Sequence, residues 1–204
     1  MRKLRLEAAD TALIDLVGPT RREHDLLGER DVPAAALYGI QTLRAIENFA
    51  VTGIELREFP TLVAALATVK EAAALANLEM KLLDREIVDA ISQAASEIRE
   101  GMHHEHFRVD MIQGGAGTST NMNANEVMAN RALEILGKER GQYQFVHPNN
   151  HLNLSQSTND VYPTAVKLAL HTSISDLQLA MIALSAAFLH KGEEFSSLIK
   201  MGRT

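Results

Sequence analysis

The sequence predicts a mainly α-helical protein. It contains only 5 Pro and 12 Gly among 204 residues, aromatic residues make up 4% of the chain, and Ala and Leu are abundant. Several long stretches also place apolar residues three and four positions apart, which is the spacing of one helix face. Hydrophobic residues reach 46% of the chain, enough for a buried core in one large domain or two small ones.

The first 60 residues carry the weakest pattern. Residues 1–20 are expected to be a frayed helix or a disordered extension. Residues 21–60 are predicted to form loops and short elements around one helical piece, QTLRAIENF at 41–49.

Two helices are predicted next. Pro60 and Thr61 open the first, which runs to residue 83. The second begins after Asp84 as its cap and stops at Gly101. The residues expected to face inward are Leu62, Leu66, Val69, Ala73 and Ala76 in the first helix, and Ile87, Ile91, Ala94, Ala95 and Ile98 in the second.

The second half predicts two more helices. FRVDMIQ at 107–113 alternates and indicates a short strand or an extended passage. A helix follows over 119–136, and a polar connection covers 138–156. A long helix then runs from about Asn159 toward Leu189, with Gly192 as its end. Its apolar stripe is broad enough for a helix inside a bundle, and comprises Val166, Leu170, Ile174, Leu177, Met181, Leu184 and Phe188.

Composition excludes several functions. Lys and Arg total 20 against 26 Asp and Glu, a net charge of -6, so a nucleic-acid partner is not expected. The absence of Cys excludes disulfides and thiolate metal sites. Glu7, Asp10 and Asp15 interrupt the basic N-terminal stretch, so we expect no secretory signal. We also expect no apolar segment long enough to span a bilayer, no membrane partner and a cytoplasmic location.

The first candidate site is the stretch QGGAGTSTNMN at 113–123. Its glycines let backbone N–H groups face a ligand, and the following helix adds its positive end. Thr118, Ser119 and Thr120 add uncharged donors, which suits a carboxylate, whereas the lysine of a nucleotide P-loop is missing. The alternative is a helix cap after a flexible loop. Three poor helix formers favour binding: Asn121, Asn123 and Asn125.

The second candidate site is SQSTND at 155–160. Ser157 or Thr158 alone would serve as the N-cap of the long helix. Six consecutive polar residues exceed that need, so a binding role is at least as well supported.

These segments resemble a known superfamily. GGAGTSTNMNANEVMANRA and HPNNHLNLSQSTNDVYPTA are similar to two signature segments of the fumarase/aspartase superfamily, and RREHDLLGERDVPAAALYGIQTLRAIENF is similar to its N-terminal region. The resemblance extends from about Arg21 to Thr204. AGTSTNMN and LRAIENF look more like aspartate ammonia-lyases than fumarases, for which a serine is expected at Ala116 and a Trp near Tyr38.

The resemblance implies a domain organisation. Residues 1–20 would be an N-terminal extension, 21–154 the N-terminal helical lyase domain, and 155–204 the start of the central helical bundle. Members of the superfamily are much longer and carry a catalytic serine on a later loop. The resemblance therefore implies a truncated chain that is inactive alone, with its general base unassigned.

The resemblance also implies a reaction and site residues. Aspartate ammonia-lyases reversibly convert L-aspartate to fumarate and ammonia through an enediolate, without a cofactor or metal. Thr118, Ser157 and Thr158 would hold the carboxylate that becomes the enediolate, and Asn159 the amino group. Thr204 would be a partial site residue. His147 and Asn149 match a secondary anion site. Active sites in the family combine three subunits of a homotetramer.

Other interpretations remain open. One is a fumarate hydratase of the same superfamily, and another is a non-catalytic helical domain that binds an anion or assembles with partners. His103, His104 and His106 crowd around Glu105, and we interpret them as a solvated turn rather than a metal site. His147 and His151 are four residues apart, but Pro148 lies between them and prevents a regular helix from presenting both as metal ligands on one face.

Overall fold

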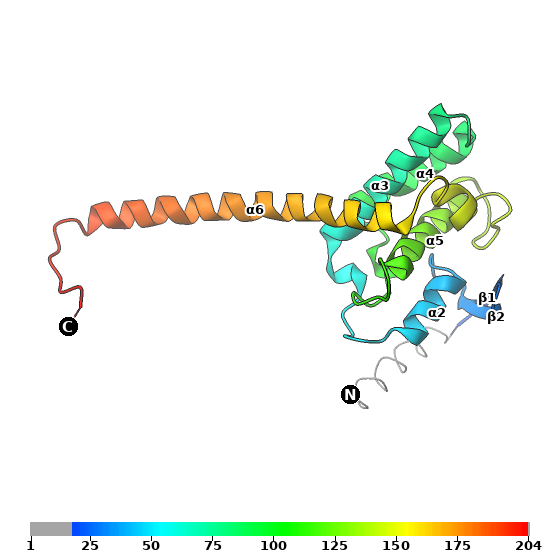
Figure 1. The fold of residues 1–204 in the computed structure, drawn as a ribbon, viewed down its shortest axis with the longest axis horizontal. Helices are drawn as coiled ribbons and strands as arrows, with labels where there is room; N and C mark the ends of the chain where they lie inside the picture. The colour runs from blue at the N-terminus through cyan, green and yellow to red at the C-terminus, as the bar shows by residue number, and fades with distance from the viewer. Residues whose placement is uncertain (1–17, 204) are drawn as a thin grey trace.

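The computed structural model describes residues 18–203, and most of the predicted N-terminal extension lies outside the described residues. Figure 1 shows a helical body from which one long helix, α6, projects to one side.

A β-hairpin begins the described chain. Strands β1 (Thr20–Asp25) and β2 (Gly28–Pro33) are antiparallel, with Thr20 opposite Pro33 and Asp25 opposite Gly28. The sequence pattern did not predict this hairpin. Seven of its twelve residues are charged, so no alternation of apolar and polar residues marks it. The expected helical piece follows as α2 (Ile40–Asn48), and a short 3-10 turn covers Leu56–Glu58.

The next two predicted helices are confirmed. They are α3 (Pro60–Glu79) and α4 (Arg85–Arg99), which pack side by side (Figure 1). The first ends four residues earlier than expected, just before Lys81 with a φ of 60°. Ala76 is exposed, contrary to expectation, and Lys70 and Asn77 lie instead among the buried residues of α3.

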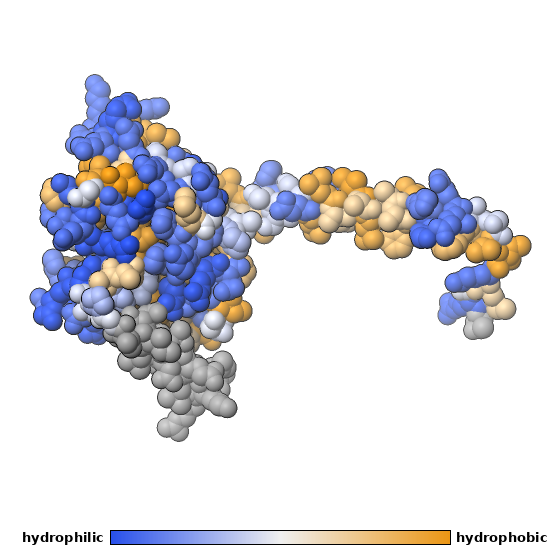
Figure 2. Space-filling model, turned by 180° about the vertical axis from the view of Figure 1, so that it is seen from behind, coloured by the Kyte–Doolittle hydropathy of each residue, from blue (hydrophilic) through white to orange (hydrophobic). Residues whose placement is uncertain are grey.

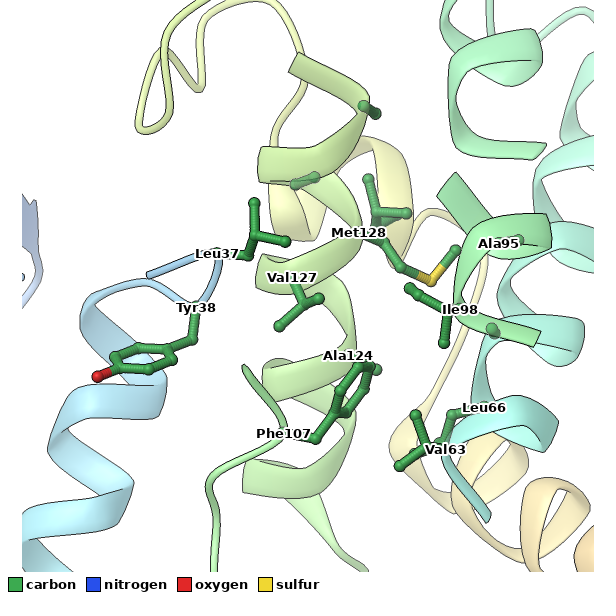
Figure 3. Packing of buried hydrophobic residues seen from close by; sticks show 14 of the residues in the cluster. Leu37, Tyr38, Val63, Leu66, Ala95, Ile98, Phe107, Ala124, Val127 and Met128 are labelled. Carbon is green, nitrogen blue, oxygen red and sulfur yellow. The ribbon is translucent and has the colours of Figure 1, made fainter. Parts of the chain in front are cut away.

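The central helix is α5 (Thr118–Ile135), within a residue of its prediction. Residues 107–113 form the extended alternative rather than a strand, with one isolated bridge between Glu55 and Asp110. Every residue of α5 from Thr120 to Asn130 is buried. Figure 3 shows the core around it: Val63 and Leu66 of α3, Ala95 and Ile98 of α4, Phe107, and Ala124, Val127 and Met128 of α5. The alanines at these contacts let the helices approach closely.

The last helix is α6 (Thr158–Glu194), which follows a π-helical turn at Pro148–Leu152. Gly192 lies inside α6, so the predicted end there was wrong. Its first turns bury Val161, Ala165 and Ala169 against the body. The rest projects with an apolar surface (Figure 2), and every residue of the predicted stripe except the half-buried Val166 is exposed in this single chain.

The length and composition of two helices correct one expectation. Both α3 and α6 are long and apolar enough to cross a membrane, so the prediction that no such segment exists was wrong. In each helix, an 18-residue window carries at most two charged residues. Since α3 lies in the protein core, length and composition alone do not distinguish a membrane span from a helix packed on other helices.

Candidate anion-binding site at the starts of α5 and α6

The start of α5 is an open helix N-terminus. Gly115 and Gly117 have φ values of 67° and 74°, the left-handed region that glycine adopts without strain. Gly117 is the N-cap and has no side chain, so it leaves the first N–H groups of α5 without a side-chain acceptor. Thr118 is exposed and Ser119 half-buried. These N–H and hydroxyl groups form an uncharged donor set suited to an anion.

The start of α6 has a side-chain cap. The Ser157 Oγ accepts a hydrogen bond from the Asn159 backbone N–H at 3.2 Å. Thr158 is half-buried as the first residue of the helix, and Asn159 is exposed beside it. The cap confirms one of the two roles weighed for Ser157, while Thr158 and Asn159 present further polar groups at the same end.

The two helix starts lie against each other. A Cβ placed on Gly117 would lie 2.7 Å from ring carbons of Tyr162, in the second turn of α6. In addition, the Asn121 Nδ2 donates to the Asn153 Oδ1 at 3.0 Å, which joins the first turn of α5 to the segment preceding α6. Two segments far apart in the sequence therefore converge within one chain. Thr204, the remaining predicted site residue, lies outside the described residues.

Three asparagines of α5 do not have the binding role that their poor helix propensity suggested. Asn121, Asn123 and Asn125 are all buried rather than turned to a ligand. The Asn123 Nδ2 donates to the His106 carbonyl at 3.0 Å. Buried hydrogen bonds thus compensate for the poor helix propensity that favoured a binding role.

His147 and Asn149 lie around the π-helical turn that precedes α6. The His147 Nδ1 accepts from the backbone N–H groups of Asn149 and Asn150 at 3.0 and 3.3 Å, so this ring caps the π-helical turn. Burial lowers the pKa of His147. The cavity beside His147, of about 570 Å³, is also lined by Arg22, His24 and His151. Asn149 lines a different cavity, of about 420 Å³, together with Ser119 at the start of α5. The two residues predicted to form the secondary site therefore line different cavities, and that of Asn149 reaches the start of α5.

The histidine cluster is half-buried and hydrogen-bonded, unlike the solvated turn that we expected. The His103 Nε2 lies 3.0 Å from the Glu97 Oε2, and the His104 Nε2 lies 2.8 Å from the Ile98 carbonyl. Burial lowers the pKa of His106 to about 4, so this ring is neutral near neutral pH. Possible metal-ligand atoms of His103, Glu105 and His106 lie within 4.8 Å of one another. His106 also accepts the Leu37 N–H through Nδ1 at 3.4 Å, and that tautomer places its proton on Nε2.

One residue close to the site was missed. Lys70 of α3 is fully buried, and its Nζ donates to the Asn153 Oδ1 and the Gln156 Oε1 at 3.0 and 2.9 Å. A signal was present in the sequence, because Lys70 comes four residues after Leu66 and therefore falls on the predicted inward face.

The mainly helical fold and the converging helix starts are matched by a family of lyases. A family model described as "Lyase" matches residues 28–204, and the chain belongs to this family. Among its relatives, the aspartate ammonia-lyase of Pseudomonas canavaninivorans is 56% identical over 184 residues, which cover 90% of this chain and 39% of the relative. The chain therefore spans about two-fifths of the length of this curated relative.

Solved structures support the same fold. The crystal structure of a fumarate lyase:delta crystallin from Brucella melitensis, in native form, is 57% identical in sequence, with a TM-score of 0.89. The similar region covers 91% of this chain and 43% of that chain. A class II fumarase from Schistosoma mansoni is 36% identical with a TM-score of 0.84, covering 91% of this chain and 39% of that one.

Proposed function

We propose that the full-length protein is an aspartate ammonia-lyase that reversibly eliminates ammonia from L-aspartate to give fumarate. The observation that carries the proposal is the convergence of two donor-rich helix starts, at Gly117 and Tyr162. The 56% identity with an aspartate ammonia-lyase, against 36% with the Schistosoma fumarase, supports aspartate rather than malate as the substrate.

The chemistry explains why uncharged donors suit this site. Removing a proton from the carbon beside an ionised carboxylate moves further negative charge onto that carboxylate, which becomes an enediolate. Fixed N–H and O–H donors aimed at its oxygens stabilise the growing charge without any reorganisation. They favour the transition state over the ground state, because the charge they meet increases during the step. Elimination of the neighbouring amine then completes the double bond of fumarate, without a cofactor or metal.

The proposed residue roles are those that the resemblance to the fumarase/aspartase superfamily implies. We assign Thr118, Ser157 and Thr158 to the carboxylate that becomes the enediolate, and Asn159 to the amino group. Ser157 contributes as the cap that fixes the first turn of α6, and its hydroxyl proton is free to donate while its oxygen accepts from Asn159. We retain His147 and Asn149 as a secondary anion site and Thr204 as a partial site residue.

We further propose that the full-length protein is a homotetramer built around α6. At about 100° per residue, six exposed apolar residues of α6 fall within one sector of about 80°. Four more fall in a second sector centred about 140° away. The first sector holds Leu170, Ile174, Leu177, Met181, Leu184 and Phe188, and the second holds Leu168, Leu179, Ile182 and Leu189. A helix that is apolar on two sides needs at least two neighbours, as in a bundle.

The proposal is tested on the full-length gene product. Fumarate formation, followed by ultraviolet absorbance, should occur with L-aspartate and not with L-malate. Turnover of malate alone would identify a fumarate hydratase instead, and turnover of neither would favour a non-catalytic anion-binding domain. Because this chain spans 39% of its relative and no described residue is assigned as the base, we expect the 204 residues alone to turn over neither.

Site variants separate binding from stability. Thr158→Val should lower kcat/KM for aspartate about 10²–10³-fold, the loss typical of removing one donor to a developing oxyanion. The matched control is Thr68→Val, an exposed threonine on α3 away from the helix starts. An unchanged kcat/KM in Thr158→Val would contradict the assigned role.

A further inference from the structure

Lys70 is an unusual residue for the interior of α3. None of its surface is exposed, although its side chain carries an ammonium group. Its described acceptors are two neutral amide oxygens, from Asn153 and Gln156, rather than a carboxylate. Burial lowers the pKa of Lys70 to about 7, while the two amide acceptors favour the charged form. Burying this group without a carboxylate is costly, and an apolar residue of similar size would suit stability better.

Asn153 connects Lys70 to both helix starts. Its Oδ1 accepts from the Lys70 Nζ at 3.0 Å, and from the Nδ2 groups of Asn121 and Asn125 at 3.0 and 3.4 Å. One oxygen thus receives donors from α3 and from the first two turns of α5. The Asn153 Nδ2 in turn donates to the Gln156 carbonyl at 3.2 Å, immediately before the Ser157 cap.

Gln156 forms the second connection. Its Oε1 accepts from Lys70, and its Nε2 donates to the Leu152 and Leu154 carbonyls at 2.8 and 3.1 Å. The Asn77 Nδ2, from the same helix as Lys70, also donates to the Leu154 carbonyl at 3.0 Å. The whole segment that leads into α6 is therefore fastened to α3 by buried side chains.

The network is not optimised for stability. The Oδ1 atoms of Asn121 and Asn125 are buried and have no hydrogen-bond partner among residues 18–203. Unsatisfied buried acceptors cost free energy, and such departures from local optimality concentrate where a site must be held in one geometry.

Resting on the proposed function, we propose that Lys70 is a positioning residue, which holds Asn153 and Gln156 so that the Ser157–Asn159 turn stays in register with the start of α5. Lys70 does not touch substrate. It fixes the orientation of the hydroxyl and N–H groups that do, and a displacement of about 1 Å at such a site can cost on the order of 100-fold in rate.

The test compares Lys70→Met with Lys81→Met in the full-length protein. Both variants remove one lysine charge, but Lys81 is exposed just after α3. At a temperature where both are folded, Lys70→Met should lower kcat/KM for aspartate on the order of tenfold or more, whereas Lys81→Met should not. A lower melting temperature with unchanged kcat/KM would reduce Lys70 to a structural role and overturn the proposal.

A double-variant cycle tests whether Lys70 acts through the α6 turn. If it does, adding Lys70→Met to Thr158→Val should cost clearly less than the product of the two single losses. Fully multiplicative losses would contradict the proposed route. Should Lys70→Met fail to fold, Gln156→Ala removes one acceptor of Lys70 and is measured in the same way, with the same expected loss.

Amide hydrogen exchange distinguishes this inference from the proposed function. Exchange at residues 157–161 should be faster in Lys70→Met than in Lys81→Met, because the turn loses its support. If the wild-type protein acts on neither substrate, the proposed function fails while this exchange difference still decides the positioning role. Equal exchange in the two variants would overturn it.

Discussion

The carboxylate of Glu126, on α5, lies 2.9 Å from the backbone nitrogen of Gly39, at the start of α2. The same carboxylate accepts the N–H groups of Gln41 and Thr42 at 2.9 and 3.0 Å. A buried acid from the central helix thus caps a helix whose N-cap residue, Gly39, lies 87 positions earlier in the chain. Gly39 is required there, since a Cβ would lie 2.8 Å from the Glu23 Oε2 and 2.9 Å from the Glu126 Cδ.

Glu126→Ala should therefore destabilise the chain by about 2–4 kcal/mol, because two buried N–H groups and one partly buried N–H group lose their acceptor. Urea denaturation measures this change in the free energy of unfolding. The control is Glu86→Ala, an exposed acid in the first turn of α4, which should change stability by less than about 0.5 kcal/mol. Equal effects of the two substitutions would show that the cap contributes little.

Gly117→Ala should disrupt the contact between α5 and α6. The new methyl would lie 2.7 Å from the Tyr162 ring and would also strain a left-handed residue. Gly115→Ala is the matched control, because its φ is similar at 67° but its nearest atom lies 4.0 Å away. Both lose about 1 kcal/mol to backbone strain, and Gly117→Ala should lose about 1–3 kcal/mol more to overpacking. The difference between their urea midpoints measures the steric contact alone.

Asp110 should make stability depend on acidic pH. Its carboxylate accepts from the backbone N–H groups of Val51, Thr52, Gly53 and Ile112. Burial alone would raise the pKa of Asp110, but these N–H groups outweigh it and hold the pKa below its usual value. The stabilisation is thus present above the unfolded-state pKa of about 3.9 and is lost as pH falls through the lower folded-state pKa.

Asp110→Asn should accordingly lower stability at pH near 6 by about 2–3 kcal/mol, with a smaller difference from wild type near pH 3. Urea midpoints of both proteins across this range give the difference directly. A difference that stays constant with pH would mean that the charge of Asp110 is unimportant.

Leu177→Lys should weaken self-association, because it places a charge in the larger apolar sector of α6. Asp176→Lys is the control, since that neighbouring position already carries a charge outside both sectors. Analytical ultracentrifugation of the full-length protein should find smaller species for Leu177→Lys and unchanged ones for Asp176→Lys. A wild-type protein that remains monomeric would contradict the proposed bundle.

Local patterns predicted the helices well, because the apolar spacing of α3 and α4 matches one face of a helix packed in a core. The hairpin formed by β1 and β2 escaped prediction, since charged and exposed strands carry no such spacing. The exposed state of the α6 stripe was not predicted either, because the sequence reports which side chains avoid water and not which partner covers them.

The sequence also predicted the two donor-rich helix starts, which appear as runs of hydroxyl and amide side chains around Thr118 and Ser157. By itself, the sequence determined the helices, most of the inward faces of α3 and α4, and the chemical character of the two segments, because these depend on residues close together in the chain. Only the tertiary structure decided that Lys70 is buried against Asn153, that Glu126 caps α2, and that Gly117 meets Tyr162. These contacts join residues tens of positions apart, and burial and hydrogen bonding in the folded chain select them.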